Sequence, residues 1–220
     1  MRRAPLNSID IVLCTPRGKA LAVLLMRDES KRARDKWTLP WAPVDGDSPL
    51  DPLAARVAQR AAGSKPGWIE QAGAFGGTRH PGDATLSVGF VAVTPEAGVS
   101  PSVRAKWFAA GDLPHLAPRH REIIDAALAR LRERMDRAPV AFHLLGATFT
   151  LGDLQSVYEL LLGRRLHKAS FRRALTAAFL VAPTDEWRSE GRGRPAQLFR
   201  YAPRKRRGGR GGVRFELLGS

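Results

Sequence analysis

The side chains with the clearest chemical potential in this chain of 220 residues are the arginines and lysines of its C-terminal quarter. Residues 164–214 contain 15 basic and 3 acidic side chains, whereas residues 1–163 carry a net charge of only +4 out of a total of +15. Positive charge concentrated in one segment is typical of proteins that bind a polyanion, because phosphates attract guanidinium and ammonium groups. We therefore expect nucleic acid as a partner. The alternative is a solvated basic surface.

Part of this charge follows a helical pattern. The spacing predicts a helix over residues 168–178, in which Lys168 and Arg172 share one face because they are four residues apart. An arginine there can make a bidentate contact to guanine, worth about 1–3 kcal/mol of discrimination, or it can touch phosphate only. A solvated helix face is again the alternative. The residues predicted to contact DNA are Lys168, Ser170, Arg172, Arg173 and Thr176 on this helix and Arg188, Arg192 and Arg194 in the hairpin that follows.

The elements around the basic helix have a recognisable order. Thr150 is predicted to cap a preceding helix, which has an apolar face at helical spacing and ends at Gly163. After the basic helix, strand-like segments at 179–181 and 197–201 flank a polar loop over 183–194. Helix, short turn, basic helix and β-hairpin is the order of a winged helix-turn-helix.

A second pattern lies in residues 37–64, where a known motif is present without its carboxylates. This segment resembles the box region of the Nudix family, in which a glycine, a spaced glutamate and an Arg-Glu-U-x-Glu-Glu-x-Gly-U helix (U is apolar) follow in fixed spacing. Arg56 matches the arginine and Gly63 the last glycine, with no gaps. The remaining box positions are occupied by Ala42 for the first glycine, Ser48 for the spaced glutamate, and Val57, Arg60 and Ala61 for the three helix glutamates.

In the Nudix family those glutamates hold Mg²⁺, and hard divalent cations need oxygen ligands. Residues 53–65 contain no Asp or Glu, so no shift of register restores the set. We therefore expect no catalytic residues, no metal and no hydrolase activity. One alternative is a divergent Nudix hydrolase acting on a nucleoside diphosphate derivative, with Asp45, Asp47 and Asp51 as metal ligands. Another is an ordinary strand–loop–helix unrelated to Nudix proteins.

Taken together, the two patterns resemble the Nudix-related transcriptional regulators of bacteria, which repress genes of NAD metabolism or of sugar catabolism. The resemblance covers residues 6–203, and its most specific motifs are F-T-L-G-D-L-Q-S-V-Y-E-L-L-L-G (149–163), L-H-K-A-S-F-R-R-A-L (166–175) and G-R-P-A-Q-L-F-R (193–200). It implies a homodimer that binds a palindromic double-stranded DNA operator. It also implies a catalytically inactive Nudix-like domain that senses ADP-ribose or a related nucleotide. An RNA- or ribosome-associated basic protein is the alternative.

Two positions depart from the family pattern. His167 stands where an aspartate would cap the basic helix, which weakens the N-cap, and Trp41-Ala42 replaces a glycine pair, which would narrow the nucleotide pocket. An electropositive site for a pyrophosphate needs arginines near the box. The residues predicted to bind the ligand are Arg56, Arg60 and Arg79, with a solvated helix face as the alternative for the first two.

The histidines and the single cysteine add no predicted site. The five histidines show no metal-ligand spacing, and we interpret His115 and His120, on either side of Pro118, as surface or capping residues. Cys14 lies in an apolar strand and is expected to be a small core residue.

The N-terminal part has the pattern of an α/β domain. Apolar runs predict strands at 8–15, 20–26, 37–40, 68–75, 85–93 and 106–108, and helices at 51–62 and 119–136. The expected fold class is an α/β (α+β) Nudix-like sandwich followed by a small winged helix-turn-helix domain. The expected domains are a Nudix-like ligand-sensing domain at 1–136 that includes the closing helix, a DNA-binding domain at 140–203, and a basic disordered tail at 204–220.

Composition excludes several classes of protein. Apolar residues make up 44% of the chain, enough to build a core, but no apolar run approaches the roughly 20 residues that cross a bilayer. The first residues lack the apolar stretch of a signal peptide, and one cysteine cannot form an internal disulfide. We expect a soluble cytoplasmic protein with no membrane partner.

Overall fold

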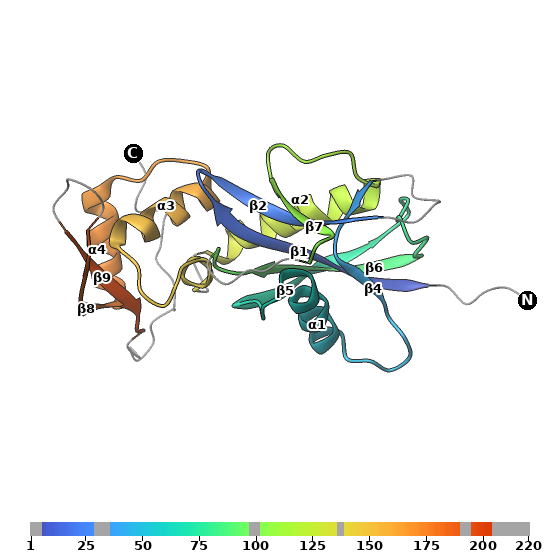
Figure 1. The fold of residues 1–220 in the computed structure, drawn as a ribbon, viewed down its shortest axis with the longest axis horizontal. Coiled ribbons are helices and arrows are strands. Elements are labelled where there is room, and N and C mark those ends of the chain that lie inside the picture. Colours follow the sequence, from blue (N-terminus) through green and yellow to red (C-terminus); the bar gives the residue numbers. More distant parts are fainter. Residues whose placement is uncertain (1–5, 29–35, 97–101, 136–138, 190–194, 204–220) are drawn as a thin grey trace, which may run out of the picture. The chain divides into compact units, whose positions relative to one another are not determined.

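The computed structural model describes residues 6–28, 36–96, 102–135, 139–189 and 195–203 (Figure 1). The chain forms two compact units, Met1–Arg130 and Leu131–Ser220. The division falls within one helix, α2 (Pro118–Arg134). The tail predicted at 204–220 lies outside the described residues.

The first unit is built on a mixed β-sheet. Its elements are β1 (Asn7–Arg17), β2 (Ala20–Arg27), β3 (Trp37–Thr38), β4 (Trp41–Pro43), α1 (Leu50–Ala62), β5 (Trp68–Gly76), β6 (Leu86–Val93) and β7 (Ala105–Ala109), followed by α2. The strand order is β3–β2–β1–β6–β5, with β4 also paired to β1 and β7 to β2. β1 and β6 are parallel, in a register that runs from Asn7 opposite Leu86 to Cys14 opposite Val93.

β1 is buried on both faces because a helix covers each side of the sheet. Figure 1 shows α1 and α2 on opposite sides. Ile9, Ile11 and Leu13 pack on the alanines of α1, while the alternate residues, Asp10 among them, face α2. Burial on both faces explains why β1 has a nearly continuous apolar sequence, and Cys14 is a core residue as predicted.

The face of the sheet that carries α2 is closely packed at Gly89 of β6. A Cβ atom at this position would lie 2.8 Å from Cγ2 of Ile123 in α2 and 2.9 Å from Cε2 of Phe75 in β5. Real Cβ atoms do not approach so closely, so only glycine lets α2 lie at this distance from the sheet.

The second unit has the order of elements expected for a winged helix. It contains the 3-10 helix η1 (Val140–Leu144), α3 (Leu151–Leu162), α4 (Lys168–Ala178) and the hairpin of β8 (Val181–Arg188) and β9 (Ala196–Tyr201). Tyr158 of α3 and Phe171 of α4 are buried and pack edge to face at 5.4 Å between ring centroids. β9 also pairs with the chain before α3 through a bridge between Phe199 and Phe149.

The ends of α3 follow from its sequence. The Thr150 side chain accepts a hydrogen bond from the Asp153 amide, and the Asp153 carboxylate accepts one from the Thr150 amide, which forms a capping box. Gly163 ends the helix in the left-handed conformation, with φ of 67°. Both predicted ends of this helix are confirmed.

The predicted boundaries of the hairpin were wrong. Phe179 is the left-handed C-cap of α4, with φ of 53°, and β8 begins only at Val181. The strand then continues through residues 183–188, which were predicted as loop. Its polar residues and Pro183 are compatible with a strand because no residue of this two-stranded hairpin is fully buried and β8 is an edge strand.

None of the helices in the described parts of the chain combines the length and the apolar character needed to span a membrane.

The packing at Gly89 leads to a stability prediction. Gly89→Ala should lower the free energy of unfolding by about 1–3 kcal/mol, because the added methyl group overpacks the space between Ile123 and Phe75. Urea denaturation would measure the change. Gly76→Ala is the matched control, since a Cβ there would meet nothing closer than 3.6 Å. Equal losses in the two variants would contradict the packing argument.

Candidate functional sites

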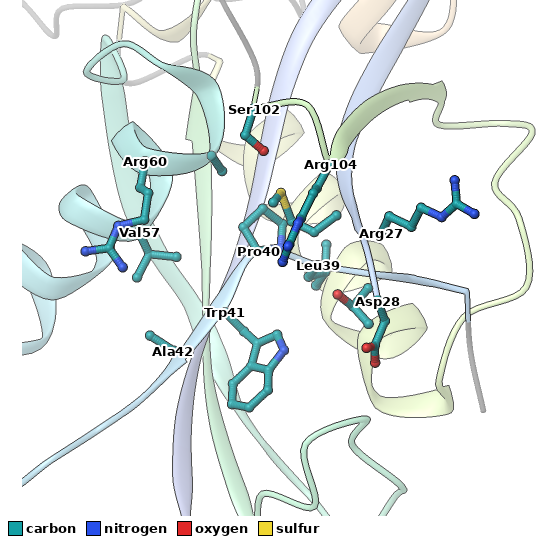
Figure 2. Close-up of a pocket in the computed structure, with 13 residues that line it drawn as sticks. Arg27, Asp28, Leu39, Pro40, Trp41, Ala42, Val57, Arg60, Ser102 and Arg104 are labelled. Atoms are coloured by element: carbon teal, nitrogen blue, oxygen red, sulfur yellow. The ribbon is translucent and has the colours of Figure 1, made fainter. Parts of the chain in front are cut away.

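The first unit contains a cavity of about 760 Å³, within the range of small-molecule sites. Its walls come from the end of β2, the segment through β3 and β4, the second half of α1 and residues 102–104 (Figure 2). The lining residues are Met26, Arg27, Asp28, Thr38, Leu39, Pro40, Trp41, Ala42, Val57, Arg60, Ala61, Ser102 and Arg104. Residues 39–41 are called the wall segment below.

The charges of the lining are predominantly positive. Arg27, Arg60 and Arg104 contribute guanidinium groups, and Asp28 is the single carboxylate among the described lining residues. Figure 2 shows Arg104 reaching toward the middle of the cavity and Arg60 on the α1 side, whereas Arg27 extends away from the centre. Guanidinium groups beside apolar and aromatic surface suit an anionic ligand with a flat ring, such as a nucleotide.

The three arginines that were predicted to bind the ligand do not all lie at the cavity. Arg60 lines the cavity, but Arg56 and Arg79 are not among the described residues that do so. Arg56 is exposed on α1, one turn before Arg60. Trp41 and Ala42, which were predicted to narrow the nucleotide pocket, both line this cavity.

The α1 face of the cavity offers no oxygen ligand for a metal. Val57, Arg60 and Ala61 are the α1 residues that line it, and none carries a carboxylate. The alternative hypothesis of a divergent hydrolase needs Asp45, Asp47 and Asp51 as metal ligands. None of the three is among the described residues that line the cavity. The arrangement can therefore neutralise a bound anion with arginines, but its helix cannot ligate a divalent cation.

A buried polar network lies beside the cavity. Nε2 of His80 and Nε2 of His120 are each 2.9 Å from Oδ1 of Asp10, and all three side chains are fully buried. Oδ2 of Asp10 accepts a hydrogen bond from the Ser8 hydroxyl at 2.7 Å, which in turn contacts Ser87 at 2.8 Å. The predicted surface or capping role of His120 was therefore wrong, because its ring is needed to pair a buried charge.

Backbone amides determine how the two histidines are protonated. The amide of Gly82 donates to Nδ1 of His80, and the amide of Leu39 donates to Nδ1 of His120, both at 3.0 Å. Each Nδ1 is therefore an acceptor, so each ring is neutral and carries its proton on Nε2, where it donates to Asp10. Burial raises the pKa of Asp10, but the hydrogen bonds from His120 and His80, together with the electrostatic attraction of the two rings, outweigh it and hold that pKa well below its usual range.

These three side chains have the residue types and proximity of a metal site, with donor atoms within 4.8 Å of one another. A metal needs a free lone pair on each imidazole nitrogen that ligates it. Here both Nε2 atoms are protonated and both Nδ1 lone pairs accept backbone amides. The cluster is therefore a network of hydrogen bonds around a carboxylate and does not fit a metal ion.

In the second unit, α4 presents a basic exposed face. Lys168, Arg172, Arg173 and Thr176 are exposed, while Phe171 and Leu175 are buried against the rest of the unit. The Thr176 hydroxyl donates to the Arg172 carbonyl, and Ser170, half-buried, has its hydroxyl 3.2 Å from Nδ1 of His167. His167 is the N-cap of α4 and makes no side-chain capping hydrogen bond, as its residue type predicted.

The hairpin arginines are placed differently. Nη2 of Arg188 in β8 lies 2.8 and 2.7 Å from the two carboxylate oxygens of Asp153, the residue that completes the capping box of α3. Arg188 therefore ties β8 to the start of α3. Arg192 and Arg194 lie outside the described residues.

Comparison with known proteins identifies the family. A family model described as the NrtR DNA-binding winged helix domain matches residues 141–201. The chain is 28% identical to the ADPR responsive transcriptional repressor NtrR of Acinetobacter baylyi, over 90% of this chain and 83% of that protein. It is 30% identical to Shewanella oneidensis NrtR, crystallised with a 27mer DNA, with a TM-score of 0.77, over 89% of this chain and 93% of that one. The chain belongs to the NrtR family of Nudix-related transcriptional regulators.

NrtR membership confirms the expected fold class, an α/β Nudix-like domain followed by a winged helix. A MutT/nudix family protein of Enterococcus faecalis shares the same fold, with a TM-score of 0.70 at 22% identity, covering 92% of this chain and 90% of that one. The individual DNA- and ligand-contacting residues remain predictions. Sequence reasoning missed the Asp10 network, although an aspartate between Ile9 and Ile11 in an apolar strand signals a buried charge in need of partners.

The unsatisfied N-cap of α4 leads to a second stability prediction. His167→Asp supplies an acceptor for the amides of the first turn and a negative charge at the helix N-terminus, so it should raise the free energy of unfolding by about 0.5–2 kcal/mol. Chemical denaturation would measure the gain. His167→Ala removes the imidazole without adding an acceptor, and an equal gain in that control would show that capping is not the cause.

Proposed function

We propose that this NrtR-family protein is a sequence-specific DNA-binding transcriptional repressor whose Nudix-like unit binds ADP-ribose or a related nucleotide. The observation that carries the proposal is the winged-helix unit: its residues 141–201 match the NrtR DNA-binding domain, and its α4 exposes a basic face. The Acinetobacter relative is an ADPR responsive repressor, and Shewanella NrtR was crystallised with DNA. The regulated genes belong to NAD or sugar metabolism, and the protein acts in the cytoplasm.

In this proposal α4 enters the major groove of a double-stranded operator. Lys168, Arg172 and Arg173 lie on its exposed face, where their cationic groups can reach base edges or phosphates. A homodimer would bind two half-sites of a palindrome, because the symmetry of such an operator mirrors that of the protein. Arg188 has the accessory role of orienting the hairpin through Asp153.

The ligand site in this proposal is the cavity lined by Arg60 and Arg104. These guanidinium groups bind the diphosphate directly and take the place of the divalent cation that Nudix hydrolases hold there. Val57, Arg60 and Ala61 occupy the positions of the Nudix helix glutamates, so the unit binds the nucleotide without hydrolysing it. The ligand then acts as an effector, and not as a substrate.

The proposal as a whole is tested by a mobility-shift titration of the full-length protein on the DNA upstream of its own gene and the neighbouring genes, with and without ADP-ribose. A specific complex whose affinity changes with ADP-ribose is expected. Binding that is equal on all sequences and indifferent to the nucleotide would refute it.

The DNA-contact residues can be tested separately. Replacing both Arg172 and Arg173 by Ala should weaken binding to the specific site by about tenfold or more, and weaken binding to random DNA less, because bidentate base contacts are lost. Fluorescence anisotropy at fixed salt would measure both affinities. Arg56→Ala, an exposed arginine of the first unit, is the control and should change neither. An equal loss on both DNAs would assign the two arginines to phosphates.

The ligand site makes a distinct prediction. Arg60→Ala should weaken ADP-ribose binding by at least about tenfold, since a charge-assisted hydrogen bond is worth about 1.5–3 kcal/mol, whereas Arg56→Ala one turn away should leave it unchanged. Titration calorimetry should give the same affinity in Mg²⁺ and in EDTA. Mg²⁺-dependent turnover of ADP-ribose at ordinary enzyme rates would instead establish a divergent Nudix hydrolase.

A further inference from the structure

The cavity and the buried network share one stretch of backbone. Leu39, Pro40 and Trp41, the wall segment, line the cavity, and the Leu39 amide donates to Nδ1 of His120 at 3.0 Å. The Pro40 carbonyl accepts a hydrogen bond from the Ile11 amide of β1 at 2.8 Å. Leu39 and Pro40 link β3 to β4, and Trp41 is the first residue of β4, paired with Asp10 of β1. The two hydrogen bonds and this pairing hold the backbone of the wall segment against its neighbours.

The second histidine supports the same segment through its side chain. The Trp41 indole meets the His80 ring edge to face, with centroids 4.9 Å apart and planes at 89°. The indole also covers Gly82, where a Cβ atom would lie 2.3 Å from the ring. The Gly82 amide in turn donates to Nδ1 of His80, so the surface under Trp41 is itself part of the network.

Asp10 joins the two supports. One carboxylate oxygen accepts Nε2–H of both histidines, and the other accepts the Ser8 hydroxyl, so every ring nitrogen and both carboxylate oxygens have partners. With both histidines neutral, only one arrangement of hydrogen-bond donors and acceptors satisfies all of these atoms. Moving the wall segment away from His120 would leave the buried Leu39 amide without its acceptor.

We propose that the Asp10–His80–His120 network is a positioning device that holds the wall segment, and with it the Trp41 indole, in the form that binds the nucleotide. The proposal rests on the function proposed above, in which the cavity takes ADP-ribose. His120 acts through the Leu39 amide and His80 through Trp41, so neither needs to touch the ligand. A wall that is held in place before binding does not have to be ordered by the ligand, which raises affinity.

The two ring nitrogens of His120 can be tested separately in the full-length protein. In His120→Asn the amide oxygen takes the place of Nδ1 and still accepts from Leu39, while the donor to Asp10 is lost. In His120→Gln the amide nitrogen takes the place of Nε2 and still donates to Asp10, while the Leu39 amide loses its acceptor. His120→Asn therefore keeps the hydrogen bond to the Leu39 amide, and His120→Gln keeps the hydrogen bond to the Asp10 carboxylate.

Calorimetric titration with ADP-ribose should show that His120→Gln binds about tenfold more weakly than the wild type, as expected for one orphaned buried donor, and that His120→Asn binds within about threefold of it. A merely structural role predicts a different order, because Gln preserves the pairing of the buried charge. Affinities that are equal in the two variants, or that follow their melting temperatures, would overturn the proposal.

Hydrogen exchange keeps the test independent of the ligand. The Leu39 amide should exchange slowly in the wild type and in His120→Asn, and at least tenfold faster in His120→Gln. If the wild type does not bind ADP-ribose, the effector assignment fails, and the exchange rates still test the network. Equal exchange in all three proteins, or Zn²⁺ binding that requires Asp10, His80 and His120 together, would overturn the positioning role.

Discussion

The ionised carboxylate of Asp10 is the constraint on which the first unit depends. It lies in the middle of the central strand β1, where a charge is stable only if nearly every lone pair accepts a hydrogen bond. Its partners come from α2, from the loop before β6 and from β1 itself. Satisfying one buried charge therefore places three elements at once, and through Leu39 it also places the backbone beside the cavity.

The charge of the lining of that cavity is the second feature on which the proposed function depends. The helix that carries carboxylates in Nudix hydrolases here presents an aliphatic side chain, a methyl group and a guanidinium group to the space. A metal-binding wall attracts phosphates through an ion that must itself be bound, whereas arginines attract them directly. In the proposed function, a Nudix-like scaffold with this lining binds a nucleotide and does not activate water.

Much of this architecture could be predicted because local signals agreed with the global fold. Thr150 and Gly163 mark both ends of α3, and the absence of acid in residues 53–65 follows from the sequence alone. The network was missed because His80 and His120 are distant from Asp10 in the sequence and meet it only when α2 packs on the sheet. The start of β8 was missed because an exposed hairpin imposes little apolar pattern on its strands.

The ion pair between Arg188 and Asp153 has a consequence for how binding would respond to ionic strength. Affinity for DNA falls with added salt in proportion to the number of phosphates whose counterions are released. A guanidinium already neutralised by a carboxylate releases few of them, so Arg188 would add little to the salt dependence of the proposed complex. The slope of affinity against salt would then report mainly on the unpaired cations of α4, such as Arg172 and Arg173, among the described residues of the second unit.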